Sequence, residues 1–269
     1  MNKNILITGA KGFIGQHLVL NLVKNKRKII QIGRNYGDLS KEKTWNKMPK
    51  ANIVVHLASK TFIPDSWNNP LEFFNTNINS TILALEYCVK RKAKLILMSS
   101  YLYGNTKKIP TNEKVQVNID NPYHLSKKIC EDICKIYSKK YNLKITILRL
   151  FNTYGKMQKN SFLIPSIIHQ IKNKKIIKVD NLSTKRDFLY IDDLIEAIVK
   201  SISLDKKFTI LNIGSGKSYS VKEIVKIMQK IMKSNLKVKG KSPRPHEIFN
   251  TLADIKKAKK NLNWEPKWS

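Results

Sequence analysis

The sequence contains few cysteines and no long apolar run, and each shortage excludes a class of protein. Its three cysteines, Cys88, Cys130 and Cys134, show neither disulfide nor metal-ligand spacing, so we expect packed core thiols and no metal site. No apolar stretch approaches the ~20 residues that a membrane helix needs. We expect the chain to start directly in a strand, and we expect no secretion signal, which would begin with a basic and then an apolar segment. These shortages favour a reduced, cytoplasmic protein without a membrane segment.

Arginine and acidic residues are also scarce beside lysine. The 51 basic residues include only six arginines and face 19 acidic ones, which gives a formal net charge of +32. The lysines are spread along the whole chain, and no basic strand carries the aromatic residues of an RNA-binding motif. We therefore do not expect nucleic acid as a partner. A positive field would still attract an anionic nucleotide substrate.

Strands and helices alternate along the chain. Apolar strands are expected at 3–8, 28–33, 52–58, 94–99, 144–150, 175–179 and 208–213, and helices at 13–25, 40–48, 71–91, 123–141, 162–173, 191–203, 220–233 and near the lysine-rich C-terminus. Buried apolar strands between amphipathic helices predict an α/β fold with a Rossmann-type, doubly wound parallel sheet. We assign residues 1–160 to the domain that carries this sheet, to which the chain returns at about 186–214. Residues 161–269 form a smaller C-terminal α/β substrate lobe.

A glycine-rich turn follows the first strand. Glycines stand at positions 9, 12 and 15, between the apolar strand and an amphipathic helix. Gly9 permits a tight turn, Gly12 lets the backbone approach a pyrophosphate, and Gly15 lets the helix pack on the strand. The amides at the start of the helix would face the phosphates. This order of elements predicts a dinucleotide site.

A tyrosine and a lysine lie four residues apart about a hundred residues later. Tyr123 could exchange a proton with a carbonyl or hydroxyl oxygen, although a tyrosine hydroxyl has an ordinary pKa near 10. The Lys127 ammonium, together with a positive nicotinamide ring, would lower that pKa. Lys127 should also hold the nicotinamide ribose. The pair predicts redox chemistry on a nicotinamide cofactor.

Seven motifs occur in order along the chain. They are Thr8–Gly15, His56–Ala58, Ser99–Gly104, Tyr123-x-x-x-Lys127, Leu148–Gly155, Lys185–Phe188 and Asn212–Gly214. Together they resemble the extended short-chain dehydrogenases/reductases that act as epimerases, dehydratases or reductases of nucleotide sugars. The resemblance implies an enzyme that binds a nucleotide-diphosphate sugar. It also implies a homodimer through helices 71–91 and 123–141.

The same resemblance assigns roles to single residues. Ser99, four residues before the Tyr-Gly pair, would supply the catalytic hydroxyl, and the neighbouring Ser100 is the second choice and a substrate contact. The cofactor would contact the three glycines, Phe13, Ile14, Asp38, Leu39, Leu57, Ala58 and Ser59 besides Tyr123 and Lys127. The substrate would contact Asn152, Arg186 and Arg244. The short 36–50 segment implies that the family's usual third strand is missing or reduced to a loop.

The end of the second strand bears on the choice of cofactor. It reads Ile32-Gly33-Arg34-Asn35 and lacks the acid that usually binds the ribose hydroxyls of NAD. Arg34 could instead pair with a 2′-phosphate. We therefore favour NADP(H), with NAD(H) as the alternative.

Three kinds of reaction share this scaffold. A 4,6-dehydratase needs an acid pair beside the catalytic hydroxyl, but those positions hold Ser100 and Tyr101. Reductases that also epimerise carry a cysteine two residues after the catalytic serine, and Tyr101 stands there instead. Two reactions remain open: reduction of a 4-keto sugar nucleotide by NADPH, which Arg34 favours, and 4-epimerisation with retained NAD. A non-catalytic NADP(H) sensor is the hypothesis from another class, and the survival of Ser99, Tyr123 and Lys127 argues against it.

Overall fold

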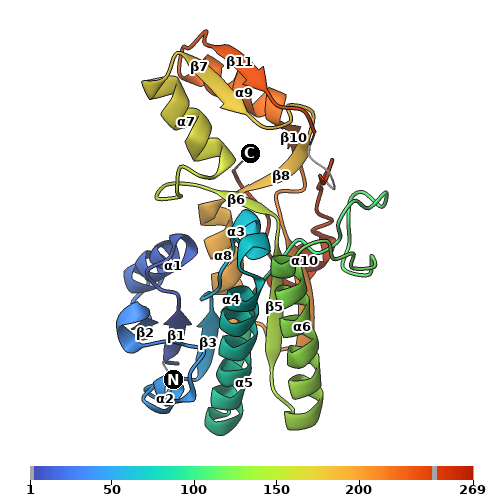
Figure 1. Cartoon of the computed structure of the whole chain (residues 1–269). Helices are drawn as coiled ribbons and strands as arrows, with labels where there is room; N and C mark the ends of the chain where they lie inside the picture. The colour runs from blue at the N-terminus through green and yellow to red at the C-terminus, as the bar shows by residue number, and fades with distance from the viewer. Residues whose placement is uncertain (1–2, 244–246, 269) are drawn as a thin grey trace.

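A six-stranded parallel sheet forms the centre of the molecule (Figure 1). The computed structural model describes residues 3–243 and 247–268. The strands lie in the order β2 (Ile29–Ile32), β1 (Ile5–Thr8), β3 (Ile53–His56), β4 (Lys94–Ser100), β5 (Ile145–Leu150) and β9 (Phe208–Ile213). All six were predicted from the sequence, and the doubly wound Rossmann-type sheet is confirmed.

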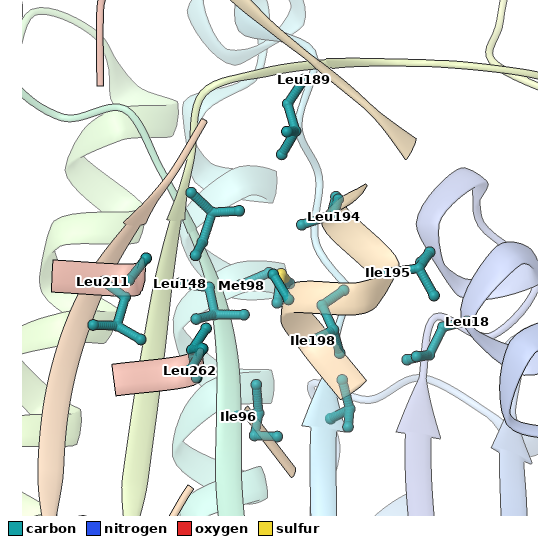
Figure 2. Packing of buried hydrophobic residues seen from close by; sticks show 14 of the residues in the cluster. Leu18, Ile96, Met98, Leu148, Leu189, Leu194, Ile195, Ile198, Leu211 and Leu262 are labelled. Atoms are coloured by element: carbon teal, nitrogen blue, oxygen red, sulfur yellow. The ribbon is translucent and has the colours of Figure 1, made fainter. Parts of the chain in front are cut away.

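Successive strand residues point to opposite faces, and helices cover both faces. Ile5, Ile7 and Ile96 contribute to the core shared with α1 (Phe13–Lys24), α8 (Ile191–Ser203) and α10 (Lys256–Leu262). Figure 2 shows Leu194, Ile195 and Ile198 of α8 packed among strand side chains of this core. The opposite face packs on α2 (Glu42–Asn46), α5 (Ser80–Arg91) and α6 (Pro122–Tyr141). The three cysteines are buried in this second core, as expected.

The connection between β2 and β3 is short. It contains a 3₁₀ turn, η1 (Arg34–Tyr36), and the five-residue α2, with no strand within this fully described segment. Strand β2 therefore forms the edge of the sheet. This agrees with the loop expected for residues 36–50.

The predicted helix 71–91 is divided into three parts. A π-helical segment, η2 (Asn75–Asn79), separates α4 (Pro70–Phe74) from α5, and a short helix that was not predicted, α3 (Ile63–Asn68), precedes them. The carbonyl oxygen of Asn77 accepts hydrogen bonds from Thr81 Oγ1 at 2.8 Å and Cys130 Sγ at 3.3 Å. The Asn77 carbonyl oxygen thus accepts side-chain hydrogen bonds in addition to a backbone one.

A smaller lobe lies beyond the end of the sheet toward which the arrows of β1 and β3 point (Figure 1). It contains α7 (Leu163–Asn173), α9 (Val221–Ile231) and the parallel pair β7 (Ile176–Val179) and β11 (Lys237–Gly240). These elements share a separate apolar cluster. A three-stranded sheet of β10 (Ser218–Ser220), β8 (Lys185–Tyr190) and β6 (Asn152–Tyr154) lies between the lobe and the main sheet. Ser220 and Glu223 form a capping box at the start of α9.

The end of the described chain packs on the main domain, not on the lobe. Asp193 of α8 accepts hydrogen bonds from the backbone amides of Lys267 at 2.9 Å and Trp268 at 3.0 Å. Trp264 is buried and donates its indole N–H to the Asp193 carbonyl oxygen at 2.9 Å. Among the helices of residues 3–243 and 247–268, none is both long and apolar enough to span a membrane.

Candidate active site

The glycine turn lies tightly between β1, α1 and the end of β3. Gly9 has a φ of +68°, and a Cβ atom there would lie 2.8 Å from the amide nitrogen of Ala58. A Cβ atom on Gly15 would lie 2.2 Å from the carbonyl oxygen of Gly9. Gly9 is therefore required for its backbone conformation, and Gly15 is required for the close packing of α1 on the turn. Gly12 is exposed and precedes Phe13, where α1 begins with free amides.

A buried histidine holds the strand end beside this turn. His56 Nδ1 lies 2.8 Å from Thr8 Oγ1, and His56 Nε2 lies 3.3 Å from Ser80 Oγ. Burial lowers the pKa of His56 to about 3, and the positive charge of Lys127 acts in the same direction. His56 is thus a neutral structural residue. Its partner Thr8 also accepts a hydrogen bond from the amide of Ala58 at 3.2 Å.

Asn77 fixes the loop that follows Ala58. Its Oδ1 accepts hydrogen bonds from Ser59 Oγ at 2.9 Å and Lys60 N at 2.8 Å. Its Nδ2 donates to Lys60 O at 3.1 Å and to Ser126 Oγ of α6 at 2.9 Å. The sequence analysis did not single out Asn77. The available signal was a run of asparagines inside a predicted helix, where asparagine is a poor former.

Tyr123 and Lys127 lie one turn apart near the start of α6. Asn121 caps this helix by accepting a hydrogen bond from His124 N, and Pro122 occupies the first turn. Tyr123 is 7% exposed and Lys127 is 4% exposed. Phe73 of α4 packs edge-on against the Tyr123 ring, with ring centres 6.4 Å apart.

Burial controls the protonation of this pair in the protein alone. It raises the pKa of Tyr123, while a hydrogen bond from the Ser100 side chain acts to lower it. Burial lowers the pKa of Lys127, against the opposing effects of Cys130 and Glu131. The lowered pKa that we expected for Tyr123 includes the effect of a positive nicotinamide ring and stays a prediction.

The two serines at the end of β4 have different partners. Ser99 Oγ donates a hydrogen bond to Glu131 Oε1 at 2.6 Å and is buried, whereas the Ser100 side chain lies near enough to Tyr123 to act on its pKa. Both serines thus reach α6 from the end of β4, Ser99 at Glu131 and Ser100 at Tyr123. Ser99, which we predicted at the reacting oxygen, is hydrogen-bonded to Glu131 instead, and Ser100, the second choice, is the serine that acts on the pKa of Tyr123.

Two cationic side chains lie at the end of β2. Arg34 is exposed in η1, and a Cβ atom on Gly33 would lie 3.2 Å from Cδ and 3.3 Å from Cε of Lys11. The Asp38 carboxylate bonds within its own turn, where its Oδ1 accepts hydrogen bonds from Ser40 N at 2.9 Å and Ser40 Oγ at 2.8 Å. These bonds lower the pKa of Asp38. Leu39 is half-buried against the second core.

The predicted substrate residues come from the strands below the lobe. Asn152 is exposed at the start of β6, and Arg186 is half-buried in β8. Arg186 lies close enough to Tyr101 to act on its ionisation, although burial dominates and raises the pKa of Tyr101 to about 12. Next to Arg186, the buried Asp187 accepts hydrogen bonds from the amides of Ser215 at 2.6 Å, Gly216 at 3.0 Å and Ala253 at 3.0 Å, which anchors β8. Arg244 lies outside the described residues.

The fold and this site define a class of protein. A Rossmann-type sheet, a glycine turn at the start of α1 and a buried Tyr-x-x-x-Lys pair are the marks of an extended short-chain dehydrogenase/reductase. The model of the NAD dependent epimerase/dehydratase family matches residues 5–214. The chain belongs to this family of NAD-dependent enzymes that act on nucleotide sugars.

Individual relatives cover almost the whole chain. A putative UDP-glucose 4-epimerase of Methanocaldococcus jannaschii is 31% identical, over 97% of this chain and 93% of the relative. UDP-glucuronic acid decarboxylase 6 of Arabidopsis thaliana is 27% identical, over 99% of this chain and 85% of the relative. The crystal structure of UDP-glucose 4-epimerase from Thermotoga maritima with UDP-glucose superposes with a TM-score of 0.93 at 27% identity, covering 99% of this chain and 94% of that one.

Proposed function

We propose that this protein is a 4-epimerase of a UDP-sugar, which oxidises and then re-reduces C4 with a retained dinucleotide. The observation that carries the proposal is the buried Tyr123–Lys127 pair, one turn apart at the start of α6, with Ser100 near enough to Tyr123 to act on its pKa. This arrangement suits reversible proton exchange at a sugar hydroxyl. The relatives support epimerisation, because the putative M. jannaschii enzyme and the T. maritima structure are both named UDP-glucose 4-epimerases. This moves our preference away from the keto-sugar reduction that the sequence favoured.

The residues present fit a pyridine dinucleotide. The glycine turn leaves no room for a Cβ atom at Gly9 or Gly15, and the free amides at the start of α1 suit the pyrophosphate. Lys127 would hold the nicotinamide ribose, and Ala58 and Ser59 would line the nicotinamide side. The bound nicotinamide would supply the acceptor and donor of the hydride.

Tyr123 would act as the acid and base. It removes the proton of the O4 hydroxyl while C4 loses its hydride, and it returns the proton after the keto sugar has presented its other face. Ser100 holds the same oxygen by a hydrogen bond. Burial raises the pKa of Tyr123, and a positive nicotinamide ring beside it would act in the opposite direction.

The side chains after Ser100 argue against dehydration. Tyr101 donates its hydroxyl to the Gly104 carbonyl oxygen at 2.7 Å, and burial raises its pKa to about 12. The next residue, Leu102, is fully buried. Neither residue supplies the acid pair that a 4,6-dehydratase needs beside the catalytic hydroxyl.

Reduction of a 4-keto sugar nucleotide by NADPH is the second candidate. Lys11 lies against Gly33 and Arg34 is exposed next to it, so two cations flank the position of the adenosine ribose. An arginine fork and an ammonium together suit a 2′-phosphate. An exchanging reductant is commonly NADPH, which is why this feature favours a reductase.

One experiment separates the two candidates. Purified protein would be denatured to release any bound dinucleotide, and native protein would be assayed with UDP-glucose and UDP-galactose. Stoichiometric NAD and interconversion that is lost in Tyr123→Phe would support the epimerase. Empty protein that prefers NADPH and turns over only 4-keto sugars would support the reductase. Tight NADP(H) binding without turnover of any sugar nucleotide would indicate a sensor.

We also propose a homodimer through α5 and α6. The hydroxyl of Tyr137 on α6 donates to Glu86 on α5, which ties the two helices together. Ile136 is 64% exposed and Tyr141 is 49% exposed on the outer side of α6. Sedimentation should give a dimer, and Ile136→Lys should give a monomer. A monomeric wild-type protein at micromolar concentration would contradict the proposal.

A further inference from the structure

Five buried polar side chains form a continuous hydrogen-bonded row beneath the candidate site. They are Ser99, Glu131, Arg149, Tyr103 and Asn212, each at most 4% exposed, and we call them the buried polar row. Ser99 Oγ donates to Glu131 Oε1 at 2.6 Å, and the Glu131 carboxylate accepts from Arg149 Nε at 2.9 Å and Nη2 at 2.6 Å. Arg149 Nη1 donates to the Tyr103 hydroxyl at 2.8 Å, which donates to Asn212 Oδ1 at 2.7 Å.

The row joins one helix to three strands. Ser99 of β4 pairs with Arg149 of β5, which pairs with Asn212 of β9, so these three residues stand side by side across the sheet. Glu131 belongs to α6, which covers this part of the sheet. The row is thus the polar attachment between α6 and the sheet.

The row is attached to α6 in register with the acid–base residues. Tyr123, Lys127 and Glu131 follow one another at intervals of four residues and therefore share one side of the helix. Two residues at the end of β4 lie against this side: Ser99 Oγ donates to Glu131, and Ser100 lies near enough to Tyr123 to act on its pKa. Lys127 lies between these two positions along α6.

Stability alone gives a weak reason for such a row. Burying an ion pair removes two charges from water, and a well-packed apolar replacement is often as stable or more so. A bidentate carboxylate–guanidinium pair is directional, however, whereas an apolar contact is not. Compared with an apolar core, the buried polar row fixes the rotation of α6 about its own axis and its position along the sheet.

We propose that the buried polar row is a positioning device that sets α6 on the sheet so that Tyr123 meets Ser100 and Lys127 points into the candidate site. Ser99, Glu131 and Arg149 are its central positioning residues. The proposal deepens the proposed function, because that function uses the placement of Tyr123. Its principal readout is nevertheless independent of any substrate.

The test compares the placement of the Tyr123 side chain with the stability of the protein. The triple variant Ser99→Ala/Glu131→Leu/Arg149→Met replaces the centre of the row by apolar side chains, and Ser99→Ala alone removes a single hydrogen bond. Thr146→Val is the matched control, because Thr146 is a buried residue of β5 whose hydroxyl has no hydrogen-bond partner. Tyrosine labelled with carbon-13 at Cζ gives a Tyr123 resonance, assigned with Tyr123→Phe, that reports its hydrogen bond and its ionisation. Melting temperature reports stability.

We expect the triple variant to melt within about 5 °C of the wild type. Its Tyr123 resonance should nevertheless move, and the midpoint of its titration should rise by about one pH unit as the Ser100 bond weakens. Turnover should fall by about 10- to 100-fold with KM little changed, since small misplacements act on kcat. Ser99→Ala should show the same changes to a smaller extent, and Thr146→Val should show none.

The proposal is overturned if the folded triple variant keeps the wild-type Tyr123 resonance and titration. If the triple variant does not fold, Ser99→Ala decides in the same way, and an unchanged Tyr123 resonance there counts against the row. Absence of turnover by the wild type on every sugar nucleotide would contradict the proposed function only, because the resonance is measured without substrate.

Discussion

His56 joins β3 to two other elements from a fully buried position, and its protonation should govern part of the acid stability. Its ring lies between Thr8 of β1 and Ser80 at the start of α5. Burial lowers the pKa of His56 to about 3 in the folded protein, whereas an unfolded histidine has a pKa near 6.5. Between these two values the unfolded chain binds the proton and the folded protein does not. The free energy of unfolding should therefore fall as the pH decreases below 6.5.

The size of the effect follows from the separation of the two values. Each pH unit between about 6 and 3 should remove about 1.4 kcal/mol through this residue, and so about 3 kcal/mol is lost by pH 4.5. A loss of that size is a large fraction of the stability of an ordinary domain. Carboxylates whose pKa is lowered, such as Asp120, add to the acid sensitivity and must be separated from the histidine.

Urea unfolding between pH 4 and pH 8 at constant ionic strength provides the assay. His56→Asn should be destabilised at pH 8, because part of the hydrogen bonding is lost, but its free energy of unfolding should fall less steeply with acid than that of the wild type. His169→Asn, at an exposed position, is the control and should follow the wild type. Equal slopes for wild type and His56→Asn between pH 6 and pH 4.5 would refute the reasoning.

Three further predictions concern the site. Ser100→Ala should lower kcat by about 100-fold with an unchanged melting temperature, because it removes a hydrogen bond at the reacting oxygen and no core contact; a wild-type kcat would show that the bond is not used. Arg34→Ala and Lys11→Met should each weaken NADPH binding by about tenfold and leave NADH binding unaltered in fluorescence titrations, and equal losses for both cofactors would exclude a 2′-phosphate contact. Gly15→Ala should lower the free energy of unfolding by about 2 kcal/mol or more in urea and abolish dinucleotide binding, because its Cβ atom would overlap the Gly9 carbonyl oxygen; normal binding would show that the turn can shift.

The hydrophobic periodicity of the sequence was sufficient to predict the strands of the main sheet, but not the short strands β6, β10 and β11 outside it. The strands of the main sheet are apolar runs between amphipathic helices, so a parallel sheet covered on both faces was the remaining solution. Strands β6 and β10 have only three residues each, and β11 contains two lysines in four residues, so none has a readable alternation. The π-helical segment η2 was hidden for a different reason. Its asparagines continue a helix, and only the buried hydrogen bonds of Asn77 show why the helix widens there.

The site shows what spacing can and cannot determine. The glycine turn and the Tyr123–Lys127 pair are short local patterns, whose geometry is fixed by a turn or by one helical repeat. The catalytic serine was assigned by counting back from Tyr103, across an irregular strand end. A difference of one residue there changes which group of α6 the serine meets, and only the structure shows that Ser99 meets Glu131 and that Ser100 lies next to Tyr123.

The burial of Tyr123 and Lys127 bears on when Tyr123 ionises. Burial shifts the pKa of the tyrosine upward and that of the lysine downward, so it opposes the charged form of both groups. The protein by itself therefore resists the phenolate–ammonium pair that the proposed reaction requires. A positive nicotinamide ring beside Tyr123 would favour the phenolate, whereas a neutral, reduced ring would not. The acid–base group would thus become a base when the cofactor is ready to accept hydride, and an acid when hydride has to be returned.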